Sequence, residues 1–362
     1  MLEKDAVRES KKNKEVLDRL LKESDRVFIV AHDRPDMDAI GSAIGMSLIC
    51  KKKGKKSYIV VDDEVEDMEK IAKGAVIDTK NEFNYIKSSE LDSLLTNNSL
   101  MIALDVNQNN RVATKNHLKK FKKIFIIDHH KTSDKTIETP YSYIREELSS
   151  TCEEISRLVT LNGVKLNRKY ANFLLAGIML DTYKLNVDSE SMLMAVAKLL
   201  NKGAKLDDVK SMFLISPEHF GLIRQISGNA EVVTCQYAIT FDRNNPNRIF
   251  KPEDLAQIAD DMLNIDVSAV FAIGYTNPDT ISISARSNGM VDVASIMKML
   301  NGGGDKNRAA TQIKESTIEE VYNKLIRVLM PYKNLEPEPQ KQLLLNKKNN
   351  WLISCFILVI NN

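Results

Sequence analysis

Apolar and polar residues alternate along the first half of the chain in two different patterns. Short apolar runs are separated by longer segments in which apolar residues recur at the helical spacing of three to four. Apolar strands that alternate with helices are typical of a parallel sheet covered on both faces. The predicted strands are Arg26 to Ala31, Tyr58 to Val61, Leu100 to Leu104 and Ile124 to Ile127, and the predicted helices lie at 16–21, 39–50, 64–73, 88–95, 110–120, 150–162 and 168–180.

A second set of strands follows further helical segments at 192–200, 206–213 and 217–228. We expect strands at 231–241, 268–275 and 280–286, and helices at 252–263, 293–300 and 308–330. The fold class is therefore α/β, with a larger parallel-sheet domain and a smaller mixed-sheet domain. The predicted division is 1–205 for the first domain, 206–229 for a helical linker, 230–332 for the second domain and 333–362 for a flexible tail.

Composition narrows the class of protein. The 51 basic and 49 acidic residues leave a net charge of +2, which argues against a surface for duplex nucleic acid. The four cysteines form no CxxC pair, so a disulfide framework is not expected. No signal peptide is recognisable, and the apolar run 351–360 is about half the ~20 residues of a membrane span. We expect a cytoplasmic protein.

Potential metal ligands follow the predicted strands. His32, Asp36 and Asp38 come after the first strand, Asp105 after the third, and Asp128-His129-His130 after the fourth. Because the carboxyl ends of parallel strands lie at one edge of a sheet, these side chains are expected to converge there. Asp181, at the end of a predicted helix, adds a fourth segment. A single such aspartate is usually a cap or turn residue, whereas the joint pattern predicts a metal site.

The number of candidate ligands favours two metal ions. Two histidines and four carboxylates exceed the needs of one tetrahedral ion, and two ions ~3.5–4 Å apart can activate water and stabilise a departing phosphoester oxygen. The imidazole share favours Mn²⁺, with Fe or Co less favoured, over Mg²⁺, which prefers oxygen ligands. The six ligands are His32, Asp36, Asp38, Asp105, His129 and Asp181. Nothing in the sequence near His117 or His219 supports a role in metal binding.

Four motifs give the chain a family resemblance. AHDRPDMDAIGSAIG (31–45), ALDVN (103–107), IIDHH (126–130) and GIMLDT (177–182) are similar, in this order, to those of the DHH phosphoesterase superfamily. The second half resembles the DHH-associated C-terminal domain through ISARS (283–287), GGG (302–304) and AATQI (309–313). Within the superfamily the chain most resembles the catalytic module of GdpP/YybT-type cyclic-di-AMP phosphodiesterases, whose full-length members are membrane-anchored with this module in the cytosol.

The resemblance implies a role for each candidate residue. His32, Asp36 and Asp105 would hold one Mn²⁺, while Asp38, Asp105, His129 and Asp181 would hold the other, so that Asp105 bridges the two. His130 would contact the substrate phosphate, and Asp128 would orient an imidazole from behind the ligands. Arg286 and the glycines Gly302, Gly303 and Gly304 would bind the nucleotide. The implied activity is Mn²⁺-dependent hydrolysis of cyclic-di-AMP to linear pApA. The implied ligand is a cyclic dinucleotide, short RNA is a second candidate, and a homodimer is allowed.

Two departures from the family pattern leave alternatives open. Asp305 stands where the family usually has a histidine after the glycines, and KTSDKT (131–136) replaces a basic, glycine-containing run. An acid repels phosphate, although Lys306 or Arg308 could compensate for it. A sensor that binds a nucleotide without turnover is therefore one alternative. An oligoribonuclease or pAp phosphatase is the other, although 6% aromatic residues give little support for a groove that stacks single-stranded bases.

Overall fold

The structure is a computed structural model that describes residues 2–61, 68–182, 185, 189–234 and 236–330. It divides into two compact units with the boundary between Leu214 and Ile215. Each unit contains its own six-stranded sheet, the first parallel and the second mixed. The predicted α/β fold class is thus confirmed.

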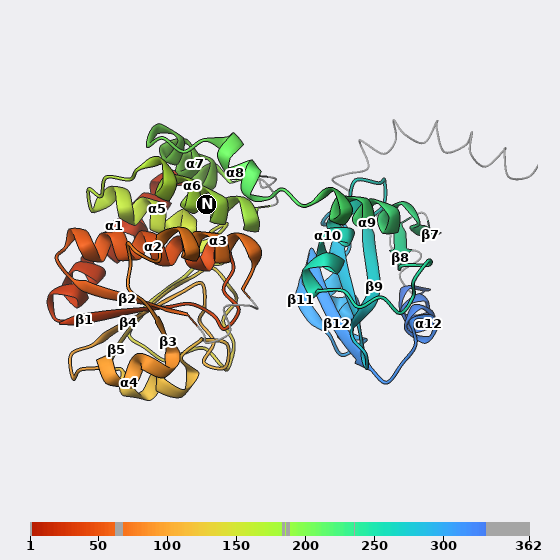
Figure 1. The fold of residues 1–362 in the computed structure, drawn as a ribbon, viewed down its shortest axis with the longest axis horizontal. Coiled ribbons are helices and arrows are strands. Elements are labelled where there is room, and N and C mark those ends of the chain that lie inside the picture. The colour runs from red at the N-terminus through yellow and green to blue at the C-terminus, as the bar shows by residue number, and fades with distance from the viewer. Residues whose placement is uncertain (1, 62–67, 183–184, 186–188, 235, 331–362) are drawn as a thin grey trace, which may run out of the picture. The chain divides into compact units, whose positions relative to one another are not determined.

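The first sheet is parallel throughout, with the strand order β3-β2-β1-β4-β5-β6 (Figure 1). The chain moves outward from β1 to β3 and then returns to the other side of β1 as β4. The neighbours β1 and β4 therefore flank the switch point, where open α/β sheets bind their ligands. The strands are β1 (Arg26–Val30), β2 (Lys56–Val61), β3 (Tyr85–Lys87), β4 (Leu100–Leu104), β5 (Lys123–Asp128) and β6 (Tyr141–Ile144).

Helices cover both faces of this sheet because successive strand residues point to opposite sides. Ile29 and Ile102 pack with the long helices, and Phe28 and Met101 pack with the short ones. The long helices are α1 (Glu3–Lys22), α2 (Met37–Lys52), α3 (Lys70–Thr79), α5 (Thr151–Leu161), α6 (Arg168–Asp181), α7 (Glu190–Asn201) and α8 (Leu206–Met212). The short ones are η2 (Ser88–Glu90), α4 (Leu91–Leu94) and η3 (Lys115–Lys120).

The second sheet has the strand order β11-β12-β10-β9-β8-β7 and is antiparallel except for the β8–β9 pair. One face packs against α9 (Pro217–Gly228) and α10 (Pro252–Met262), and the other against α11 (Val293–Lys298) and α12 (Ile318–Leu329). The strands are β7 (Glu231–Thr234), β8 (Tyr237–Thr240), β9 (Ala269–Asn277), β10 (Thr280–Ser287), β11 (Gly303–Asp305) and β12 (Arg308–Lys314).

Several predicted elements were wrong in detail. The strand predicted at 231–241 is two antiparallel strands, and the first part of the helix predicted at 308–330 is β12. From residue 309 to residue 314, buried or half-buried positions alternate with exposed ones, which suits a strand on the outer part of a sheet. The short strands β3 and β6 were not predicted, because three or four partly polar residues carry little signal. Of the helix predicted at 64–73, residues 64–67 lie outside the described residues, as do the predicted tail and its apolar run.

The boundary between the units falls within the predicted linker at 206–229. Helix α8 packs on α6 in the first unit, whereas α9 packs on α10 in the second. Among the described residues, no helix has both the length and the apolar character needed to cross a membrane.

A buried glutamate joins the first helix to the core of the first unit. Glu154 on α5 is 0% exposed and accepts hydrogen bonds from Ser10 Oγ at 2.6 Å and from Asn13 Nδ2 at 2.9 Å, both on α1. Burial raises the pKa of Glu154 to about 7 against these hydrogen bonds. The folded state therefore holds this proton more tightly than the unfolded chain does. Stability from this group is greatest below its unfolded pKa and falls as the pH rises toward 7.

We expect Glu154→Gln to reduce this pH dependence, because the amide keeps the shape of the neutral acid and cannot ionise. Relative to the unaltered protein, the variant should gain about 1–2 kcal/mol of stability between pH 5 and pH 7. Urea unfolding at several pH values measures the difference. An unchanged difference across this range would show that the carboxyl group is already ionised in the fold.

Candidate metal centre

The first turn of α2 supplies two of the predicted ligands. The carboxylate of Asp36 caps the helix by accepting hydrogen bonds from the backbone N–H groups of Asp38 and Ala39 at 2.9 and 3.1 Å. Asp38 is 0% exposed and accepts hydrogen bonds from the backbone N–H groups of Thr151 and Cys152 at 2.7 and 2.8 Å. These are the first residues of α5, so the N-terminus of a second helix orients the Asp38 carboxylate.

Asp105 lies at the centre of the site, directly after β4. Its Oδ2 lies 3.6 Å from His32 Nε2, and its Oδ1 lies 3.3 Å from His129 Nε2. Thr151 Oγ1 donates a hydrogen bond to Oδ1 at 3.2 Å. The backbone at Asp105 has φ 59°, in the left-handed region that aspartate and asparagine tolerate better than most residues. The two oxygens of one carboxylate therefore face two different histidines.

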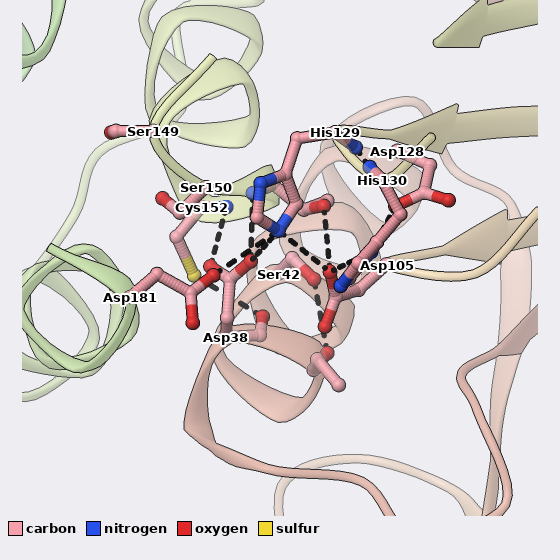
Figure 2. A network of polar contacts seen from close by, with 12 residues as sticks. Asp38, Ser42, Asp105, Asp128, His129, His130, Ser149, Ser150, Cys152 and Asp181 are labelled. Atoms are coloured by element: carbon pink, nitrogen blue, oxygen red, sulfur yellow. Dashed lines mark hydrogen bonds and ion pairs between the residues drawn. The ribbon is translucent and has the colours of Figure 1, made fainter. Parts of the chain in front are cut away.

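In the Asp128-His129-His130 triplet, Asp128 is the last residue of β5 and the two histidines follow it, and the three side chains have different surroundings (Figure 2). Asp128 Oδ1 accepts hydrogen bonds from the backbone N–H groups of His129 and His130 and lies 2.8 Å from His130 Nδ1. Asp128 thus orients the imidazole of His130. The His130 side chain is 44% exposed, whereas that of His129 is 16% exposed and points toward Asp105 and Asp181.

The six predicted ligands gather into two adjacent clusters. In one, ligand atoms of His32, Asp36 and Asp105 all lie within 4.8 Å of one another. In the other, the same holds for Asp38, His129 and Asp181, with His129 Nε2 at 3.1 Å from Asp181 Oδ2. Because Asp105 Oδ1 also approaches His129, its carboxylate touches both clusters. The side chains of the two clusters are thus linked through one shared carboxylate.

Electrostatics in the cluster favour the entry of a cation. Burial and the neighbouring carboxylates of Asp105 and Asp181 raise the pKa of Asp36 to about 7 and that of Asp38 well above its ordinary value. Burial opposes charge on His129, but Asp105 and Asp181 outweigh it and raise the pKa of this imidazole. Burial also opposes charge on Asp105, but the imidazoles of His129 and His32 beside it hold its pKa below the usual range.

Several buried polar atoms here have no hydrogen-bond partner among the described residues: His32 Nδ1, His129 Nε2 and Asp128 Oδ2. Unsatisfied buried polar atoms are costly unless a ligand or ion completes them. The repelling carboxylates and the unsatisfied imidazole of His129 both fit divalent metal ions with mixed nitrogen and oxygen ligands. The residues present can therefore hold such ions.

The predicted nucleotide-binding residues lie in the second unit. Arg286 on β10, together with Gly303 and Gly304 on β11, lines a cavity of about 350 Å³. Because a helix was predicted at 308–330, the glycines were expected to precede one, but Gly303 and Gly304 lie in β11 at the edge of the sheet and pair with β12. The glycines are therefore followed by a strand and not by a helix. His117 and His219, which were not expected to bind metal, each lie near an acid outside the two clusters, His117 at 3.6 Å from Asp92 and His219 at 3.4 Å from Asp254.

Sequence reasoning missed the residues that support the site. Thr151 and Cys152 hold Asp38, and Asn107 Nδ2 donates a hydrogen bond to the backbone oxygen of His130 at 3.0 Å. A signal was present for the first two, because Ser150 and Glu153 have the spacing of a helix-capping pair. Asn107 stands within the ALDVN motif. The capping pair does not indicate that α5 approaches Asp38, and the motif does not indicate that Asn107 contacts His130.

Comparison with known proteins defines the class. Residues 26–178 match the model of the DHH family, N-terminal domain, and residues 235–330 match that of the DHHA1 domain. The chain belongs to the DHH family, with a DHHA1 domain in its second unit.

The curated relatives include Cyclic-di-AMP phosphodiesterase GdpP of Geobacillus thermodenitrificans, which is 31% identical over 87% of this chain and 49% of its own length. The chain thus spans about half the length of that relative. Bifunctional oligoribonuclease and PAP phosphatase NrnA of Thermus thermophilus is 23% identical over 84% of this chain and 89% of its own length. Among solved structures, an exopolyphosphatase-related protein from Bacteroides fragilis shares the fold, with a TM-score of 0.75 and 20% identity over 90% of this chain and 98% of that chain.

Proposed function

We propose that the chain is a two-metal phosphodiesterase that hydrolyses cyclic-di-AMP to linear pApA, with Mn²⁺ as the metal. The single observation that carries the proposal is the Asp105 carboxylate, whose oxygens face His32 on one side and His129 on the other. The similarity to GdpP over both units supports the cyclic dinucleotide as substrate.

The two clusters support one proposed ligand set each. His32, Asp36 and Asp105 would hold one ion, and Asp38, Asp105, His129 and Asp181 the other. When bound, the pair of ions supplies the Lewis acidity that activates water and stabilises charge on a phosphoester. Imidazole ligands favour Mn²⁺ over Mg²⁺, which prefers oxygen.

The remaining residues would position the substrate. Asp128 holds His130 by Nδ1 at 2.8 Å, which leaves Nε2 of this half-exposed ring to meet a phosphate oxygen. Thr151 and Cys152 fix Asp38 through backbone N–H groups, so that its carboxylate needs little reorganisation when the ligands assemble. Arg286 would bind the nucleotide from the second unit through its guanidinium fork.

The second candidate function is an oligoribonuclease or pAp phosphatase on the same scaffold. The likeness to NrnA along most of that protein's length supports it. A phosphatase would use the same six ligands, so the metal site alone does not separate the two functions. The two functions differ in the length of the nucleotide that the chain accepts.

The test is to incubate the purified chain with cyclic-di-AMP and Mn²⁺ and to identify the product by chromatography. We expect pApA to form with Mn²⁺, to form more slowly with Mg²⁺, and to be absent with a chelator. The same preparation is offered pAp and short RNA as competitors. Turnover of these without turnover of cyclic-di-AMP would replace the proposal with the second candidate, and binding without any product would favour a sensor.

A further inference from the structure

The cavity in the second unit has a polar floor and one apolar wall. Its volume of about 350 Å³ falls in the range of small-molecule sites. Alternate residues of β10 and β12 form the floor, including Ser282, Ser284 and Gln312. Pro252 and Leu255 of α10 form the wall. A planar base could lie on such a surface, with hydroxyl and amide groups beside its edges.

Two arginines lie at the same end of this floor. Arg286 and Arg308 are opposite each other in the register of β10 and β12, and both line the cavity. Residues directly opposite on antiparallel strands project from the same face with Cβ atoms ~4.5–5.5 Å apart. Like charges so placed repel, whereas a phosphate between them accepts hydrogen bonds from both guanidinium groups.

The Arg286 side chain is already fixed in position. Its Nε donates to Asp260 Oδ1 at 2.7 Å, its Nη1 donates to Ser284 Oγ at 3.0 Å, and the side chain is 11% exposed. Asp305 lies opposite Arg308 in the register of β11 and β12. Each arginine thus has an acid on a neighbouring element. An ion-pair network of purely structural origin would account for these pairs, but it would not account for the open cavity beside them.

The three glycines at 302–304 differ in whether close packing explains the missing side chain. A Cβ at Gly302 would lie 2.3 Å from the backbone oxygen of Ala310, and one at Gly304 would lie 2.3 Å from that of Arg308. Close approach to β12 therefore explains both residues. A Cβ at Gly303 would meet no described atom within 4 Å, yet this residue lines the cavity. The missing side chain at Gly303 is not a packing requirement, and it keeps this side of the cavity open.

We propose that Arg308 binds a phosphate group of a nucleotide together with Arg286. Arg308 would then replace the histidine donor that the family usually has at the position of Asp305. The ligand class is a nucleoside phosphate unit, with its base along the β10–β12 floor and its phosphate at the arginine pair. This inference rests on the proposed function for the identity of the nucleotide, but not for the binding itself.

The test is calorimetric titration of the full chain, in the presence of a chelator, with AMP and separately with adenosine. AMP should bind the unaltered protein more tightly than adenosine does. Arg308→Gln should weaken AMP by roughly 10- to 100-fold while leaving adenosine nearly unchanged, because only the phosphate loses a charged donor. Arg308→Lys should recover only part of the loss, since an ammonium lacks the planar fork.

Lys306→Gln is the matched control, because Lys306 carries the same charge on the same hairpin but does not line the cavity. It should weaken AMP less than about twofold, as expected for a screened surface charge. Equal effects of the Lys306 and Arg308 changes, or no AMP binding by the unaltered protein at millimolar concentration, would overturn the inference. Arg308-dependent AMP binding without hydrolysis of cyclic-di-AMP would keep it and reject the proposed function. If Arg308→Gln leaves the hydrolysis of cyclic-di-AMP unchanged, the proposed function is kept and the inference about Arg308 is rejected.

Discussion

Replacing Asp105 with asparagine is expected to reduce phosphodiester hydrolysis by about 10³-fold or more while the chain stays folded. The carboxylate contacts both ligand clusters, so its loss weakens both proposed ion sites and removes several kcal/mol of charge stabilisation. Asparagine is a better replacement than alanine because residue 105 has φ 59°, a conformation that asparagine adopts readily. Loss of activity can then be separated from backbone strain.

Metal binding by the Asp105→Asn variant can be measured without an activity assay, through the effect of Mn²⁺ on its melting temperature. Mn²⁺ should raise the melting temperature of the unaltered protein, since a ligand that binds only the native state stabilises it. The Asp105→Asn variant should show a much smaller rise. Asp25→Asn is the matched control, because Asp25 precedes β1 at the opposite end of the same sheet. Full activity together with a normal Mn²⁺ response in the Asp105 variant would remove Asp105 from the metal site.

Adding a single methyl group at Gly177 is expected to cost about 3 kcal/mol of stability and to lower activity more than tenfold. A Cβ there would lie 2.4 Å from Cys152 Sγ and 3.0 Å from Asp38 Cα. The glycine therefore allows α6 to approach α2 and α5 at the point where α5 holds the Asp38 carboxylate. In Gly177→Ala these helices must separate, which moves Asp38 relative to the other ligands.

Gly74→Ala provides the comparison on a helix without such a contact. Gly74 lies inside α3, and no described atom is within 4 Å of the position its Cβ would take. Alanine here should stabilise the protein by about 0.5–1 kcal/mol, because it has the better helix propensity. Chemical unfolding and Mn²⁺-dependent turnover of both variants measure the contrast. A Gly177→Ala protein as stable and active as the Gly74 variant would show that the helices have room to adjust.

The sequence predicted the first unit better than the second for a physical reason. The four predicted strands of the first sheet are buried on both faces, so they read as continuous apolar runs. Residues 303–305 and 308–314, in the second unit, form an edge strand and its neighbour. Their small and polar residues resemble a loop and a helix start as much as they resemble strands. Residues 308–314 are held as a strand by pairing with β10, and 303–305 by pairing with β12. The pairing with β10 joins segments more than 20 residues apart, so it is not a local signal.

The candidate ligands were predictable because their position depends on simple topology. Apolar runs that alternate with helices imply parallel strands, and the carboxyl ends of parallel strands lie at one edge, so His32, Asp105 and His129 were expected together. The structure brings all six candidates to that edge. The supporting residues depend on packing between helices. That α5 reaches Asp38 follows from contacts at Gly41 and Gly177, which no spacing in the sequence specifies.

The Asp128-His129-His130 triplet shows what the sequence determines and what the tertiary structure determines. By itself the sequence determined the chemistry available after β5, an acid and two imidazoles beside other metal-competent residues. Only the tertiary structure decided that Asp128 holds His130 while His129 faces Asp105 and Asp181. The reason is that residue types are local properties of the chain, whereas the direction of each ring depends on partners contributed by β4, β5 and α6. The same holds for Arg286 and Arg308, which are far apart in sequence and opposite each other in the sheet.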